Sequence, residues 1–244
     1  MSGIDVFCVF PEAVAATLRV GVVGRAIERG IVDFRTFDLR DYAPNRRIDD
    51  MPFGGGAGMI VRVDVVARAF EEVYEVPARK VRENRRVIVT EPGGRVLDQG
   101  YVEELAGGLV ADGNLTIVCG RYGGVDERVG EHLATEAVSF GPFVLSGGEI
   151  VAAAISDAVI RLLDGVLGNA ESLVGESFSE VDVLGPPQYT RPAEWDGEAV
   201  PGVLLSGDHA KIKSWRDRVP RQDRGYAGIL WGSAFVAPSA RGEK

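Results

Sequence analysis

The chain has 244 residues, of which 45% are hydrophobic and 26% are charged. This composition is typical of a globular protein and excludes disorder driven by excess charge. No stretch reaches the ~18 apolar residues of a membrane span, the N-terminus lacks the features of a signal peptide, and two cysteines exclude a disulfide scaffold or a four-cysteine zinc site. A net charge of −9 argues against non-specific coating of nucleic acid but leaves room for a local basic patch. We therefore expect a cytoplasmic globular protein.

The first two thirds of the chain alternate between predicted strands and predicted helices. In chain order, we expect a buried strand at 4–10, a helical stretch at 12–29 that Gly21 and Gly24 weaken, an alternating strand at 32–39, a polar loop at 40–58, a helix at 62–74, a strand at 86–92, a helix at 99–105, a buried strand at 114–120, a short helix at 126–133, a short strand at 137–141 and a long helix at 148–163. This alternation predicts an α/β domain with a mostly parallel sheet over residues 1–163.

The amino-acid composition changes after residue 163, and the alternation of predicted strands and helices ends there. Residues 164–181 are rich in glycine and acidic side chains, which predicts a flexible linker. Residues 182–244 form a predicted small, mainly helical C-terminal domain, with a proline-rich stretch at 186–201, a basic helix at 209–218 and a tail without periodicity.

Glycine is unusually frequent, at 32 residues or about 13%, against ~7% on average. Glycine-bearing loops at 91–94, 120–124 and 141–148 each follow a predicted strand. Taken singly, each loop favours a tight turn. Because ligands of open α/β sheets bind at the carboxyl ends of the strands, the three together favour a shared small-molecule pocket. The chain has neither a G-x-G-x-x-G turn nor a P-loop, which counts against a generic nucleotide-binding enzyme.

The cysteines and histidines give little sign of chemistry. Cys8 and Cys119 lie inside apolar strands, where cysteine usually fills the core. His132 and His209 are far apart in sequence and have no metal-ligand spacing, so we expect them at the surface or at a helix end.

Two charged features are more specific. Arg161 lies near the end of the apolar helix, where a cation ordinarily complements the helix C-terminus. Residues 208–224 hold six basic and three acidic side chains, a local charge of +3, with Trp215 among them. Basic residues beside an aromatic suit phosphate contact and base stacking, although a solvated basic helix has the same composition.

At these loops the sequence resembles the bacterial tRNA (guanine-N1)-methyltransferases of the TrmD type, within the knotted SPOUT superfamily. The matching stretches, in the family's order, are VFPE (9–12), GVVGRAIERG (21–30), DDMPFGGGAGM (49–59), CGRYGGVDER (119–128), FVLSGGE (143–149), DGVLG (164–168), ESF (176–178), QYTRP (188–192) and VLLSGDHAKI (203–212). The resemblance covers about residues 1–218, and the tail after Arg218 does not look like the family's longer helical end.

The resemblance implies transfer of a methyl group from S-adenosylmethionine to N1 of the guanine at tRNA position 37. It also implies a deep trefoil knot that binds the cofactor, a homodimer with active sites at the interface, and a C-terminal domain that holds tRNA. Carried over by position, the cofactor pocket would be lined by Thr90, Pro92, Gly120, Tyr122, Phe140, Gly141, Pro142, Phe143, Val144, Leu145, Gly147 and Gly148. The tRNA contacts would come from Asp49, Asp50, Arg191, Lys211, Lys213 and Arg216.

The resemblance makes Arg161 and Glu176 the catalytic residues. Guanine N1 carries a proton, so a carboxylate must accept it as the methyl group moves, and Glu176 matches the family's base. Charge then builds on O6, where the Arg161 guanidinium can stabilise it. We expect tRNA binding to order the linker that carries Glu176.

Two departures from the family's pattern qualify these roles. Gly123 stands where the family has an acidic residue, so one carboxylate near the cofactor is missing and the use of a divalent ion such as magnesium is left open. Glu176 stands where the family has aspartate, one methylene shorter. These departures keep a second hypothesis open, a tRNA- or cofactor-binding module with weakened catalysis.

Overall fold

The computed structural model describes residues 2–168, 175–178 and 184–218. The chain divides into two compact units, Met1–Glu171 and Ser172–Lys244. Each is described by itself below.

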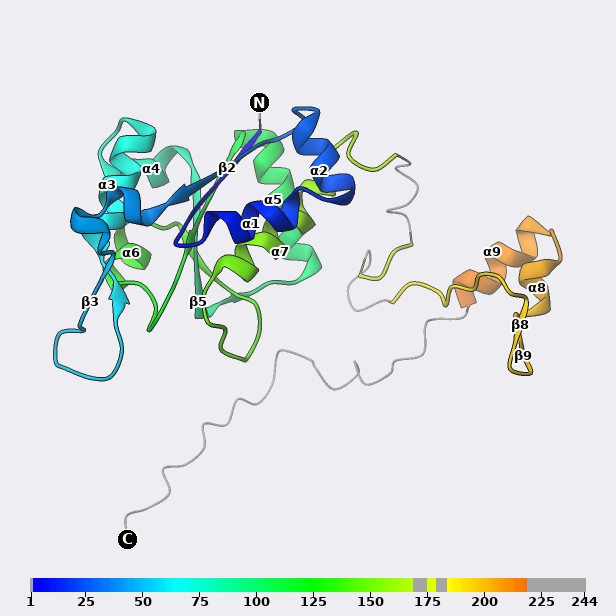
Figure 1. The fold of residues 1–244 in the computed structure, drawn as a ribbon. Coiled ribbons are helices and arrows are strands. Elements are labelled where there is room, and N and C mark those ends of the chain that lie inside the picture. Colours follow the sequence, from blue (N-terminus) through cyan, green and yellow to red (C-terminus); the bar gives the residue numbers. More distant parts are fainter. Residues whose placement is uncertain (1, 169–174, 179–183, 219–244) are drawn as a thin grey trace, which may run out of the picture. The chain divides into compact units, whose positions relative to one another are not determined.

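The first unit is built on a five-stranded sheet whose neighbouring strands all pair in parallel, which confirms the predicted α/β class (Figure 1). The strand order is β2-β1-β6-β5-β7. The strands are β1 (Gly3–Cys8), β2 (Asp33–Asp38), β5 (Arg86–Val96), β6 (Asn114–Cys119) and β7 (Glu136–Ser139). The trefoil knot stays a prediction.

Helices cover both faces of this sheet, because its central strands are apolar on both sides (Figure 1). One face packs against α1 (Pro11–Leu18), α2 (Gly21–Glu28), α5 (Gln99–Asp112) and α7 (Glu149–Ile160), and the other against α3 (Val63–Tyr74), α4 (Ala78–Asn84) and α6 (Glu127–His132). Strand β1 shows the alternation: Ile4 and Val6 face the first core, and Phe7 faces the second.

Several predicted elements differ from those observed. The single helical stretch predicted at 12–29 is two helices, because Gly21 has a left-handed φ of 66° where α2 begins. Helix α5 runs seven residues beyond the predicted end, to a left-handed Gly113 cap. Helix α4 was not predicted, although Pro77 stands at its N-cap.

The polar stretch at 40–58 is not one open loop. It contains the short 3-10 turns η1 (Leu39–Tyr42) and η2 (Pro44–Arg46), and the strand β3 (Asp49–Asp50), which pairs with β4 (Ile60–Val61). Between the two strands, Gly54, Gly55, Gly56 and Gly58 all have positive φ.

The most consequential difference is in β5, which continues to Val96 instead of ending at Pro92. Its register against β7 shifts between Thr90 and Arg95, which both pair with Val138. Residues 91–94 therefore bulge out of the sheet at its carboxyl edge. Gly94 makes this possible, because a Cβ there would lie 2.4 Å from the Ala137 carbonyl carbon.

The described part of the second unit holds the hairpin β8 (Glu194–Trp195) and β9 (Glu198–Ala199), followed by α8 (Gly202–Leu205) and α9 (His209–Arg218). The helix predicted at 209–218 is confirmed. The hairpin was missed inside the proline-rich stretch, although its Asp196–Gly197 turn, with φ values of 53° and 81°, is the usual signal for a tight hairpin. The tail after Arg218, with Arg221 and Arg224, lies outside the described residues.

Candidate functional site

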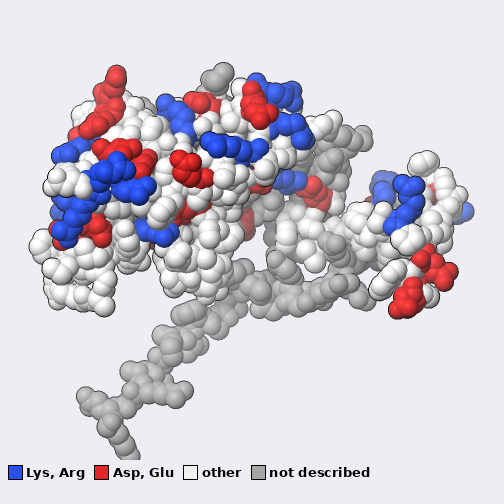
Figure 2. Space-filling view, in the orientation of Figure 1, with Lys and Arg blue, Asp and Glu red and all other residues white. Residues whose placement is uncertain are grey.

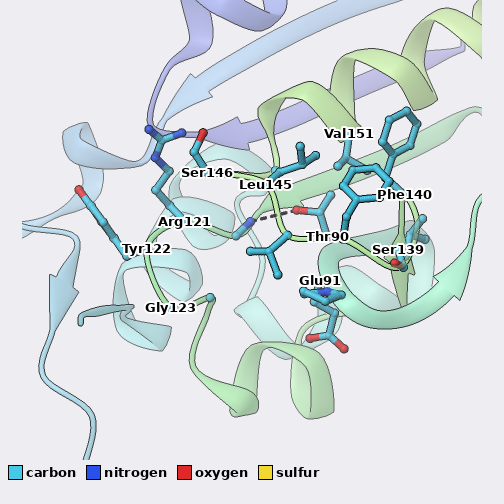
Figure 3. Close-up of a pocket in the computed structure, with 18 residues that line it drawn as sticks. Thr90, Glu91, Arg121, Tyr122, Gly123, Ser139, Phe140, Leu145, Ser146 and Val151 are labelled. Carbon is cyan, nitrogen blue, oxygen red and sulfur yellow. Dashed lines mark hydrogen bonds between the residues drawn. The ribbon is translucent and has the colours of Figure 1, made fainter. Parts of the chain in front are cut away.

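A pocket opens at the carboxyl ends of β5, β6 and β7, where the three glycine-bearing loops meet (Figure 3). We call it the glycine-loop pocket. It is lined by Thr90, Glu91, Pro92, Gly120, Arg121, Tyr122, Gly123, Gly124, Val138, Ser139, Phe140, Phe143, Val144, Leu145, Ser146, Gly147, Gly148 and Val151. The predicted convergence of these loops on one small-molecule-sized cavity is thereby observed.

Thr90 ties the three loops together. Its hydroxyl accepts a hydrogen bond from the Gly120 amide at 3.0 Å, and the Gly120 carbonyl accepts one from the Gly148 amide at 2.8 Å. A Cβ at Gly148 would lie 2.0 Å from the Thr90 hydroxyl oxygen and 3.0 Å from the Cys119 Cα. Glycine is therefore required at 148 by close packing, and the floor of the pocket is backbone.

The upper wall of the pocket in Figure 3 comes from the loop at 139–148 and from α7, and combines apolar side chains such as Leu145 and Val151 with Ser146. Phe143 is 52% exposed and Val144 is 84% exposed, although both lie beside the cavity. Exposed apolar side chains at a cavity mouth are typical of a surface that a ligand covers. Gly141 shapes this loop with a φ of 154°, since a Cβ there would lie 2.6 Å from the Phe143 ring.

One cation borders the pocket. Arg121 contacts Glu149 at 3.3 Å and its guanidinium lies 4.7 Å from the centre of the Phe10 ring. Glu149 is buried at the start of α7, and its second oxygen, Oε1, has no hydrogen-bond partner among the described residues. Arg121 is therefore held by its partners at the edge of the cavity.

Ten of the twelve residues predicted for the cofactor line the glycine-loop pocket; Gly141 and Pro142 do not. The pocket also recruits residues that the sequence did not single out, above all Glu91 and Arg121. Glu91 was not predicted as a site residue, because the sequence gave no sign of the bulge in β5 that brings it to the cavity.

The two predicted catalytic residues lie in different units. Arg161 caps the C-terminus of α7, with its amide donating to the Asp157 carbonyl at 3.1 Å, and is half-buried. Glu176 is also half-buried, next to Ser177, whose hydroxyl accepts from the Gly185 amide at 3.1 Å. The neighbouring carboxylates Glu171 and Glu180 lie outside the described residues.

The residues predicted to contact tRNA form separate groups. Asp49 and Asp50 make up β3 in the first unit, where Arg47 pairs with Asp50 at 3.3 Å. The other predicted contacts belong to the second unit, just before β8 and on α9.

In the second unit, Arg191 and Arg216 line a common groove with the aromatic residue Tyr189. We call this surface the aromatic groove; its full lining is Pro187, Gln188, Tyr189, Thr190, Arg191, Ala193, Val200, Leu204, Leu205, Ile212 and Arg216. Trp215 packs against Tyr189 with ring centres 6.3 Å apart.

Lys211 and Lys213 lie on the same helix as Arg216 but are not part of the groove. Both are exposed, and they pair with Asp208 at 3.1 Å and Asp217 at 2.8 Å. Figure 2 shows the basic side chains gathered on this unit, with the acidic ones at the tip of its hairpin. Exposed pairs of this kind contribute little to stability.

The cysteines and His132 lie where the sequence predicts them. Cys8 and Cys119 are fully buried neighbours, and burial raises the pKa of the Cys119 thiol; the prediction that they fill the core is confirmed. His132 is at the surface, 3.6 Å from Glu131. Over the part of the chain that the structure describes, no group of three or more His, Cys, Asp or Glu side chains is placed to hold a metal ion. In that same part, none of the helices combines the length and apolar character needed to cross a membrane.

Comparison with known proteins gives one consistent answer. A family model described as tRNA (Guanine-1)-methyltransferase TrmD matches residues 2–225. The chain is 45% identical over 213 residues to the tRNA (guanine-N(1)-)-methyltransferase of Persephonella marina, covering 86% of this chain and 80% of that protein. It is 43% identical over 215 residues to the protein of the same name from Porphyromonas gingivalis, covering 87% and 91%, and 46% identical over 213 residues to that of Roseobacter denitrificans, covering 86% and 85%.

Proposed function

Because the chain belongs to the tRNA (guanine-1)-methyltransferase TrmD family, we propose that it transfers a methyl group from S-adenosylmethionine to N1 of the guanine at tRNA position 37. The observation that carries this proposal is the glycine-loop pocket, where ten residues implied by the family resemblance converge on one cavity. The tRNA substrate makes the cytoplasm the expected site of action.

The pocket suits S-adenosylmethionine in shape and chemistry. Its floor is backbone from Gly120 and Gly148, which can approach an adenine edge closely. Its upper wall offers Leu145 and Phe140 as apolar faces for the ring. When bound, the cofactor supplies an electrophilic methyl group on a sulfonium.

We assign the two chemical roles at the target base to Arg161 and Glu176. Glu176 accepts the proton from guanine N1, which frees the nitrogen lone pair to attack the methyl group. Arg161 stabilises the charge that develops on O6. Arg161 lies at the end of α7, and we expect tRNA binding to order the stretch that carries Glu176.

We further assign tRNA contact to the aromatic groove with α9, and to Asp49 and Asp50 of β3. A homodimer is part of the proposal. A groove between α1 and α7, lined by Ala13, Ala153 and Ala154 and by Ile150, which is 57% exposed, supports a partner's approach at this face. The trefoil knot belongs to the proposal on the strength of the family alone.

The test is an assay with purified protein, labelled S-adenosylmethionine and two unmodified tRNA transcripts. One transcript has guanine immediately 3′ of the anticodon, and the other has adenine there. We expect label only in the guanine transcript. Equal labelling of the two transcripts contradicts the position, and binding of cofactor and tRNA without any transfer favours the alternative of a binding module.

A further inference from the structure

The glycine-loop pocket contains one acidic side chain among its described lining residues, Glu91, and this residue has no established role. The family resemblance implies an acidic residue at position 123, where this chain has Gly123. Both residues line the same cavity. In Figure 3 they lie below Thr90, on the side opposite Leu145 and Val151.

The backbone explains why Glu91 is available. The register shift in β5 pushes residues 91–94 out of the sheet, and Glu91 is the first residue of that bulge. A bulge at the end of a strand re-aims a side chain that would otherwise follow the alternation of the sheet. Glu91 therefore borders the cavity instead of pairing along β7.

The backbone around Gly123 leaves little room for a side chain. The Gly123 amide donates to the Met59 carbonyl at 2.8 Å, and a Cβ at 123 would lie 3.0 Å from that same oxygen. A side chain at 123 would thus start against the backbone that precedes β4. That backbone would have to move by a few tenths of an ångström to accept a side chain at 123.

The electrostatic surroundings of Glu91 favour a cationic ligand. Among the described residues, no hydrogen bond or ion pair is made by its carboxylate. Burial, and to a smaller degree the negative charge of Glu127, raises the pKa of the Glu91 carboxyl above its ordinary value. A positive group beside it would relieve both effects.

We propose that Glu91 binds the ammonium group of the methionine part of S-adenosylmethionine. This inference rests on the proposed function. Of the charged groups on the donor, the sulfonium cannot accept or donate a hydrogen bond, whereas the ammonium offers three donors to a carboxylate. Glu91 is a binding and positioning residue, and it takes no part in the proton transfer.

The test measures ligand affinity by calorimetry, without tRNA, for the parental protein and for Glu91→Gln. Three ligands are compared: S-adenosylmethionine, S-adenosylhomocysteine, which keeps the ammonium and lacks the sulfonium charge, and methylthioadenosine, which lacks the whole amino-acid part. We expect Glu91→Gln to weaken the first two by about 10- to 100-fold, the usual value of a charged hydrogen bond, and to leave methylthioadenosine unchanged.

Glu127→Gln is the matched control, because Glu127 is an exposed carboxylate on α6 that influences Glu91 but does not line the pocket. It should leave all three affinities within about twofold, as a surface charge does. Circular dichroism of each variant confirms that it is folded.

Other outcomes overturn the inference. An equal loss for all three ligands assigns Glu91 to the ribose or to the shape of the loop, a loss for S-adenosylmethionine alone assigns it to the sulfonium charge, and no loss removes it from binding. Failure of the parental protein to bind S-adenosylmethionine at all contradicts the proposed function instead, so the two failures are distinguishable.

Discussion

The two candidate binding surfaces of this protein are built in opposite ways. The glycine-loop pocket has a floor of backbone, where hydrogen bonds of 3.0 and 2.8 Å join the Gly120 amide to the Thr90 hydroxyl and the Gly148 amide to the Gly120 carbonyl. The aromatic groove and α9 instead present exposed side chains such as Lys211 and Lys213, which form ion pairs with nearby carboxylates on the same stretch of chain. The comparison teaches that shape should govern the first surface and charge the second.

The largest loss of activity is expected when the proposed base, Glu176 in the second unit, is replaced. Glu176→Gln keeps the size of the side chain but cannot accept a proton, so single-turnover methylation should fall by roughly 10²–10⁴-fold. Rates measured across pH separate this loss of chemistry from a loss of binding. Glu176→Asp, which restores the family's residue, should retain or raise the rate.

Glu194→Gln is the control for this change, because Glu194 is an exposed carboxylate of β8 in the same unit. It should methylate at the parental rate. Were Glu176→Gln to do so as well, another group would accept the proton, and the chemical role given to this unit would be wrong.

A somewhat smaller loss of activity is expected when Arg161, at the C-terminus of α7, is replaced. Arg161→Ala removes a donor that acts on developing charge, which typically costs ~2.7–4 kcal/mol or about 10²- to 10³-fold in turnover. Cofactor affinity, measured by calorimetry, should stay nearly intact because Arg161 does not line the glycine-loop pocket. A collapse of cofactor affinity would instead make Arg161 a structural part of the first unit.

The third prediction tests the claim that shape governs the pocket. Gly148→Ala forces a methyl group against Thr90 and Cys119, so the free energy of unfolding should fall by about 1–3 kcal/mol, as overpacking does. Cofactor affinity should fall with it. Denaturant unfolding and calorimetry give the two quantities.

Gly107→Ala is the matched control, because Gly107 lies inside α5 with no atom within 4 Å of its Cβ position. The change should stabilise the protein by up to about 1 kcal/mol through helix propensity. If Gly148→Ala behaves like Gly107→Ala, the pocket floor is not set by close packing.

The smallest effect is expected on the charged surface. Replacing Lys211, Lys213 and Arg216 together with alanine should flatten the salt dependence of tRNA affinity by up to ~0.9 in log–log slope per lost phosphate contact. Affinities measured at several salt concentrations give the slope, and cofactor affinity should not change. An unaltered slope would place the tRNA elsewhere on the protein.

The sequence predicted the regular helices and strands of the first unit better than the irregular features of the chain. The strands at β1 and β6 and the helix α7 were predictable because buried apolar runs and helical periodicity are local properties of the chain. The bulge that exposes Glu91 was not, because it depends on how residues 91–94 meet β7. The β8–β9 hairpin was missed for a different reason: its Asp196–Gly197 signal stood among prolines that argue against strands.

The same distinction holds for the site. The family resemblance assigned cofactor-binding residues position by position, and ten of them line the pocket. The loops at 120–124 and 141–148 were also recognisable as ligand-binding candidates because they are rich in glycine. The sequence alone could not predict which other side chains line the same cavity. The Arg121 side chain, for example, contacts Glu149 and Phe10, which are distant from it in the sequence.

The chemical identity of the product tests the central claim most directly. Guanine-bearing tRNA is incubated with the protein and S-adenosylmethionine, digested to nucleosides and analysed by mass spectrometry against standards. The account predicts 1-methylguanosine, with the modified residue mapping immediately 3′ of the anticodon. Methylation at N2 or N7 of guanine, which requires no proton to be taken from N1, would contradict the roles given to Arg161 and Glu176.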